Sequence, residues 1–430
     1  MLPKCLPVEI LDCIFSYLDL HSLQACSKAC PIFSRVAERY LYVDITLHGY
    51  ELEHRDWSHW TLPLNVTQLS SLLSEQPHIA NYILTLTIYA AGQNERLYQF
   101  VDAIPPILDL LQKLRKLTVQ RPWRCLYVLS VDGNWWLELD GIFGLSLLKS
   151  LRLPSMEEAC FAGMIRVDRS LLNGIKSVKL DACSISVIRD SEDPSSDDSY
   201  PSLKDLSIID MQTSSLVKLA SCYWPAKCCK HLQHFQFSSC FRIFGDPFAA
   251  IEPILIACSN TLTTLDVNLK SFCKLNPIFS IRSNLSLDTA EPQVGREIPK
   301  LPILPHLKDA SFHAKISPYR IRNRTLFVAL TELLEIMPNS QRLFFHFHFV
   351  SISDDNLEAD WSFLDDFLAN HGRSAKVIDL CISPGEQATF SWVDQDPHSM
   401  RYPNINRMVQ QNTLVIVSPL LFSGCYCIRS

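Results

Sequence analysis

The chain has 430 residues, of which 47% are hydrophobic and 20% are charged, a composition that supports a packed core and excludes wholesale disorder. This length accommodates two or more ordinary domains, or one small domain followed by a long repeat array. The net charge of −6 argues against nucleic acid as the main partner, because phosphate binding requires a basic surface.

The N-terminal region is apolar, but it lacks the features of a secretory signal. Lys4, Glu9, Asp12 and Asp19 interrupt it, and it has no unbroken apolar run followed by a small-residue cleavage site. No stretch of about 18 uncharged apolar residues occurs, so we expect no membrane span. The 16 cysteines could serve disulfides in a secreted protein or remain reduced. Their thin spread favours reduced thiols in a cytoplasmic or nuclear protein.

Residues 6–42 have the pattern of three short helices. Pro7 suits a first helical turn, Ser22 is a candidate cap for the second helix, and Pro31 suits the start of the third. Apolar residues recur at helical spacing throughout the segment. These positions are Ile10, Leu11, Ile14, Phe15 and Leu18, then Leu23, Cys26 and Cys30, then Phe33, Val36, Ala37, Tyr40 and Leu41. Three such short helices cannot bury all of this apolar surface among themselves.

The segment resembles the F-box family, whose pattern begins Leu-Pro-x-Glu-(Ile/Val/Leu)-Leu and continues to a Cys-rich helix. Ala29 and Phe33 depart from the usual Val and Trp. The run 37–47, AERYLYVDITL, looks like F-box proteins of the fungal type and leads into a strand at 43–47. The alternative is that residues 6–42 only form a helical cap on the rest of the chain. The matching residues are Leu6, Pro7, Glu9, Ile10, Leu11, Ile14, Phe15, Leu18, Asp19, Leu20, Leu23, Cys26 and Cys30.

The resemblance implies an α/β protein with an F-box-like helical domain at 1–45 and a substrate-binding domain at 46–430. It implies a substrate-recognition subunit of a Skp–cullin–F-box type E3 ubiquitin ligase that is not itself an enzyme. Its partners would be the Skp-type adaptor, through it a cullin, and an unknown protein substrate. The adaptor would contact Leu6, Pro7, Ile10, Leu11, Ile14, Leu18 and Leu23.

Beyond residue 46 a short hydrophobic pattern repeats about every 30 residues. It reads Φ-x-x-Φ-x-Φ, where Φ is mostly apolar, and weaker copies start at Ser340 and Ala375. One strand per repeat with helices between resembles leucine-rich repeats and predicts a parallel-stranded solenoid. A less regular α/β domain remains the alternative. The clear copies start at Ile83, Leu114, Leu148, Ile175, Leu203, Leu232, Leu262 and Leu307.

Two insertions interrupt the repeats. Residues 189–201 are too charged to pack, and we expect a mobile loop there, either without a role or carrying kinase sites at Ser195 and Ser196. Residues 275–305 are rich in proline and lengthen one repeat into a long loop of the kind that often contacts ligands.

Polar positions of the predicted strands would share one concave face. Cations come first along the chain and carboxylates later, which would orient a dipolar partner, although these positions are also typical of an ordinary solvated surface. The candidate substrate-binding residues are Lys116, Arg152, Lys179, Asp205, His234, Gln236, Asp266, Asp309, Arg342 and Phe344.

The sequence offers no motif for catalysis or for a cofactor. It has no phosphate-binding glycine loop, no Gly-x-Ser-x-Gly elbow and no His-Glu-x-x-His helix. Cys228, Cys229, His231 and His234 are the one group that looks like metal ligands, but adjacent cysteines point in different directions. We therefore predict no cofactor and no metal. The alternatives to a ligase subunit are a scaffold that binds only the adaptor or other proteins, and an enzyme whose site the sequence hides.

Overall fold

The structure is a computed structural model of the chain. It divides into two compact units, unit 1 at Met1–Leu203 and unit 2 at Lys204–Ser430. Among the described residues, no helix has the length and apolar character needed to cross a membrane. The described residues are 6–48, 61–90, 99–121, 137–138, 141–163, 165–186, 202–211, 213–220, 224–238, 247–269, 302–316, 334–349, 377–383 and 414–417. Almost all of the predicted loops 189–201 and 275–305 lies outside these ranges.

Unit 1 begins with a helical module made of α1 (Val8–Phe15), α2 (Leu20–Ala29) and α3 (Pro31–Leu41). Pro31 occupies the first turn of α3, as predicted. The cap of α2 differs from the prediction, because the Asp19 side chain, not Ser22, caps the helix by accepting a hydrogen bond from the Ser22 N–H at 2.7 Å. The three helices close around one small core, formed by Leu11, Phe15, Leu23, Val36, Ala37 and Leu41.

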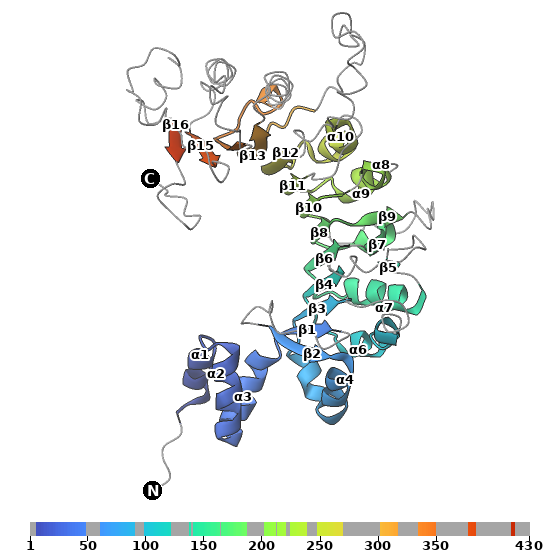
Figure 1. Ribbon diagram of the computed structural model, residues 1–430, viewed down its shortest axis with the longest axis vertical. Coiled ribbons are helices and arrows are strands. Elements are labelled where there is room, and N and C mark those ends of the chain that lie inside the picture. The colour runs from blue at the N-terminus through green and yellow to red at the C-terminus, as the bar shows by residue number, and fades with distance from the viewer. Residues whose placement is uncertain are drawn as a thin grey trace, which may run out of the picture. The chain divides into compact units, whose positions relative to one another are not determined.

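The module continues into a parallel sheet with the strand order β2-β1-β3-β4-β6-β8. Its strands are β1 (Asp44–His48), β2 (Leu62–Asn65), β3 (Thr85–Tyr89), β4 (Lys116–Arg121), β6 (Glu158–Gly163) and β8 (Ser177–Asp181). The helices α4 (Val66–Glu75), α6 (Pro105–Leu110) and α7 (Gly141–Leu151) lie on the side of this sheet away from α1–α3 (Figure 1). A smaller parallel sheet joins β5 (Leu137–Glu138), β7 (Ile165–Asp168) and β9 (Ser184–Ser186). Short 3-10 turns lie at Pro77–Asn81 and Arg169–Leu172.

Unit 2 also has a parallel sheet, in which consecutive strands along the chain are neighbours. The helices α8 (Thr213–Ala220), α9 (Trp224–Cys228) and α10 (Pro247–Cys258) lie together on one side of it (Figure 1). The strands are β10 (Asp205–Ile209), β11 (His234–Ser238), β12 (Thr264–Leu269), β13 (Asp309–Ile316), β14 (Arg342–Phe349), β15 (Val377–Ser383) and β16 (Leu414–Val417).

A recurring backbone contact fixes the register of these strands. In unit 2 the carbonyl of Lys204, one residue before β10, accepts hydrogen bonds from the N–H groups of Gln233 (2.8 Å) and His234 (3.0 Å) at the start of β11. The Gln233, Thr263 and Lys308 carbonyls repeat this contact with the next strand. Equivalent positions of successive strands therefore stand directly beside one another.

The hydrophobic pattern located most strands correctly. Seven of its eight clear copies, and the weaker copy at Ser340, begin two residues before a strand of the structure. The copy at Leu148 is wrong, because this segment belongs to α7. The strand of that repeat is β6, where Met156, Ala159 and Phe161 hold the buried positions of the pattern. The other weak copy, at Ala375, starts outside the described residues, two positions before β15.

Candidate functional site

The surface of the helical module carries a patch of exposed hydrophobic side chains. Leu6, Ile10 and Ile14, three of the predicted adaptor contacts, are 51%, 47% and 44% exposed. Ile10 and Ile14 lie one turn apart on α1 and so share a face of the helix. Pro7, the N-cap residue of α1, is exposed as well, whereas Leu18 is partly buried against the module core.

Two of the predicted adaptor contacts are corrected by the structure. Leu11 and Leu23 are 2% and 5% exposed and belong to the module core, so their side chains are not available to a partner. The reason is geometric, because Leu11 follows Ile10 by one residue and points about 100° away from it around α1. Their F-box match therefore reflects packing within the module.

The sequence analysis missed three exposed hydrophobic residues of the module. Tyr17 is 82% exposed, Val8 47% and Ile32 42%. Tyr17 lies in the turn that follows α1, seven positions after Ile10, and this spacing is a signal that could have identified it. We call Leu6, Ile10, Ile14 and Tyr17, which follow one another at intervals of three or four residues, the apolar patch.

Contacts between helices hold the module together under this patch. The Tyr40 hydroxyl on α3 donates a hydrogen bond to the Asp12 main-chain carbonyl on α1 at 2.9 Å. The rings of Phe15 and Phe33 meet edge to face with centroids 5.5 Å apart. Arg39 lies 3.8 Å from the Asp12 carboxylate, but both side chains are well exposed, so this ion pair adds little stability.

The module also contacts the rest of unit 1 through α3. The Glu38 carboxylate lies 3.4 Å from His78 Nε2 on the 3-10 turn before β3. Burial, and secondarily Glu38, raise the pKa of Tyr42, which follows α3 directly. The helical module and the first strands are thus joined within one unit.

Comparison with known proteins agrees with this geometry. Residues 4–48 match the family model described as F-box-like, a range that contains α1–α3 and β1. The N-terminal module is an F-box-like domain. No curated protein sequence matches the chain. The match covers about a tenth of the residues, so it characterises the F-box-like domain alone.

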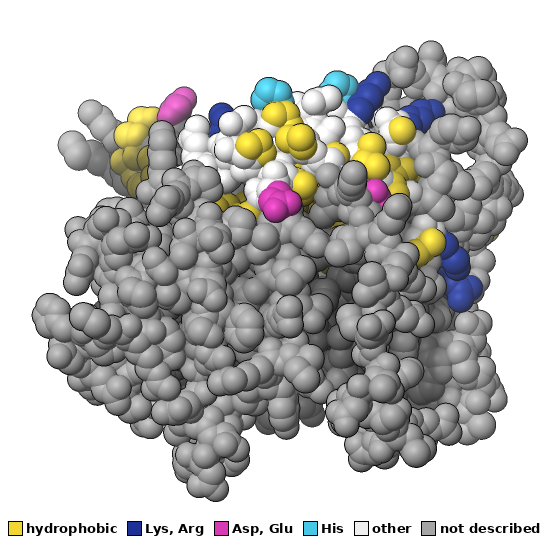
Figure 2. Space-filling model, turned by 90° about the horizontal axis from the view of Figure 1, so that it is seen from above, with side chains coloured by type: hydrophobic (Ala, Val, Ile, Leu, Met, Phe, Trp, Pro, Cys, Tyr) yellow, Lys and Arg dark blue, Asp and Glu magenta, His cyan; other side chains and the backbone are white. Residues whose placement is uncertain are grey.

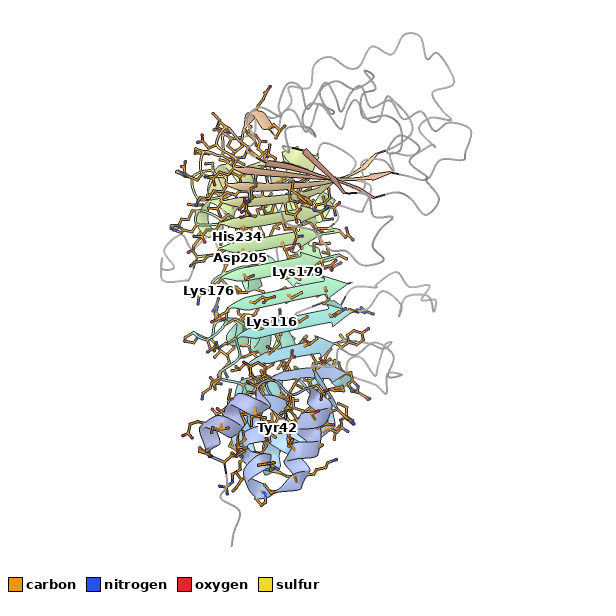
Figure 3. All side chains as sticks on the ribbon, turned by 90° about the vertical axis from the view of Figure 1, so that its left-hand side faces the viewer. Tyr42, Lys116, Lys176, Lys179, Asp205 and His234 are labelled. Carbon is orange, nitrogen blue, oxygen red and sulfur yellow. The ribbon has the colours of Figure 1, made fainter. Side chains whose placement is uncertain are left out.

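In unit 1, two of the predicted substrate-binding residues lie on strands. Lys116 on β4 and Lys179 on β8 occupy partly exposed strand positions (Figure 3). The Lys116 ammonium pairs with the Glu158 carboxylate on the neighbouring strand at 2.7 Å, so much of its charge is compensated. The predicted position of Arg152 on a strand is wrong. This residue follows the last residue of α7 and lies on no strand, because the repeat copy that predicted it is helical.

In unit 2, all seven predicted substrate-binding residues lie on strands. The strand register puts them on the same face of the sheet. Asp205, His234, Thr264, Asp309 and Arg342 are aligned in one row across β10–β14, and Ser207, Gln236, Asp266, Ser311 and Phe344 form a second row. Figure 3 shows Asp205 and His234 side by side on adjacent strands. Residues between the rows, such as Leu206 and Phe235, are buried. We call these two rows, with His313, the strand face of unit 2.

A chain of polar contacts runs across this strand face. The Ser207 hydroxyl donates to the Gln236 side-chain carbonyl at 2.7 Å, and the Gln236 amide donates to Asp266 Oδ2 at 3.1 Å. His313 Nε2 lies 3.6 Å from Asp266 Oδ1, and its ring lies against that of Phe344 with centroids 6.3 Å apart. The contacts hold the Asp266 carboxylate in a fixed position on the surface.

Ser311, His313 and Asp266 resemble a hydrolytic triad in composition but not in geometry. Ser311 Oγ lies 3.1 Å from His313 Nε2, and Asp266 Oδ1 approaches the same nitrogen. A nucleophilic triad requires the hydroxyl and the carboxylate on opposite ring nitrogens, so that one side orients the ring while the other accepts the proton. This group therefore lacks the arrangement for nucleophilic catalysis.

Eight cysteines of the described segments are free thiols, namely Cys13, Cys26, Cys30, Cys160, Cys183, Cys228, Cys229 and Cys258. Burial raises the pKa of the Cys183, Cys229 and Cys258 thiols, that of Cys258 to about 12, so these groups remain protonated and unreactive at neutral pH. Cys229 is buried while His231 is exposed, and no group of three or more potential metal ligands occurs within the described ranges.

On the face of the described residues that is seen from above, the charged side chains do not form one extended basic area (Figure 2). Seen from above, the described surface intersperses basic, acidic and histidine side chains with hydrophobic ones (Figure 2). Such a mixed surface suits protein recognition better than binding to a nucleic-acid backbone.

Proposed function

We propose that this protein is the substrate-recognition subunit of a Skp–cullin–F-box type E3 ubiquitin ligase. The observation that carries the proposal is the apolar patch on the F-box-like domain. Hydrophobic residues that cluster on a short helix and stay in water favour a partner that buries them. F-box-like domains typically bind the Skp-type adaptor, which is the partner we assign to this patch.

We further infer that the rest of the chain is a leucine-rich-repeat-like solenoid that holds a protein substrate. Parallel strands that recur with the hydrophobic pattern, with helices on one side, support this inference. The polar strand positions would meet the substrate, as the concave surface does in repeat proteins. In this role the protein brings two other proteins together inside the cell and forms or breaks no bond itself.

Co-purification tests the adaptor and cullin assignments. A tagged full-length chain is compared with the variant Leu6→Ser/Ile10→Ser/Ile14→Ser, which changes exposed residues only and spares the core residue Leu11. The matched control is Ile142→Ser/Leu145→Ser on α7, where the side chains are 76% and 68% exposed. We expect wild type and control to retain both adaptor and cullin and the patch variant to retain neither.

The other outcomes have definite meanings. Adaptor without cullin identifies a scaffold that works outside a ligase. Equal loss from the patch variant and the control shows nonspecific hydrophobic capture. Absence of both proteins from a folded wild-type chain leaves the F-box-like domain as a helical cap and contradicts the proposal.

A further inference from the structure

We draw no further inference here: the strongest candidate, the exposed hydrophobic side chains of Leu110 on α6 and of Ile142 and Leu145 on the neighbouring helix α7 in unit 1, carries none because nothing in the described part of the structure shows what covers them.

Discussion

The Tyr40 hydroxyl donates a hydrogen bond to the Asp12 main-chain carbonyl at 2.9 Å and thereby joins the last helix of the F-box-like domain to the first. Burial, and after it Asp12, raise the pKa of Tyr40, so the hydroxyl keeps the proton that it donates throughout the neutral range. Because α1 carries Ile10 and Ile14 of the apolar patch, this bond helps to hold these two residues in place on the domain.

Replacing Tyr40 with phenylalanine should therefore destabilise the domain. We expect Tyr40→Phe to lower the free energy of unfolding by about 1 kcal/mol, the usual net value of one hydrogen bond. Urea denaturation followed by circular dichroism measures the change. Tyr17→Phe is the matched control, since Tyr17 is 82% exposed and should lose almost nothing. Equal stabilities of the two variants would show that the Tyr40 bond has no structural role.

Adjacent residues on α1 should respond in opposite ways to truncation. Leu11→Ala opens a cavity in the module core and should cost about 2–5 kcal/mol of unfolding free energy. Ile10→Ala changes an exposed side chain and should cost less than about 0.5 kcal/mol. Adaptor binding should nevertheless fall in Ile10→Ala while the fold remains intact. A stable Leu11→Ala variant, or an unfolded Ile10→Ala variant, would reverse our assignment of the two faces of α1.

Asp44, the first residue of β1, should make stability depend on pH. Burial raises its pKa above the ordinary value of 3.8, and Lys116 offsets part of that shift. Because the pKa is raised on folding, the ionised carboxylate costs stability, and this cost grows as the pH rises through the folded-state pKa. Asp44→Asn should thus have a higher Tm than wild type at pH 7. At pH 3, where the wild-type carboxyl is protonated, the two Tm values should converge. A constant difference at both values would exclude Asp44 as the source.

Gly163 should tolerate no side chain. It ends β6 with a φ of 84°, and a Cβ atom there would lie 1.7 Å from the Arg121 carbonyl oxygen on β4. The clash involves backbone on both strands, so relief requires the strands to separate. We expect Gly163→Ala to cost about 2 kcal/mol or more. Gly174→Ala, at a similar φ of 86°, controls for backbone conformation and should cost about 1 kcal/mol. Similar losses in chemical denaturation would mean that the close contact is unimportant.

Much of the strand arrangement follows from the sequence, because buried positions of a strand between helices must be apolar and must recur. The prediction failed at Leu148, where the pattern also fits one face of α7. The true strand has Ala159 and Phe161 in place of large aliphatic residues, so a pattern weighted to leucine does not identify it. Periodicity alone does not separate short apolar helices from strands.

The candidate surfaces were less predictable than the fold. The family pattern lists Leu11 and Ile10 together, although one holds the domain core and the other faces solvent. That distinction depends on how α1 rotates against α2 and α3. Likewise, the contacts of Asp266 with Gln236 and His313 depend on strand register. The register brings Asp266 beside Gln236, 30 positions earlier in the chain, and beside His313, 47 positions later. Neither relationship is visible in local sequence.

The most direct test of the central claim is the affinity of purified full-length protein for purified Skp-type adaptor, measured by isothermal titration calorimetry. We predict that wild type and Ile142→Ser/Leu145→Ser bind with the same Kd. We predict that Leu6→Ser/Ile10→Ser/Ile14→Ser binds at least about a hundredfold more weakly, since losing each buried aliphatic side chain costs about 1 kcal/mol or more. Unchanged affinity in the patch variant, with its fold intact, would contradict the assignment of this surface to the adaptor.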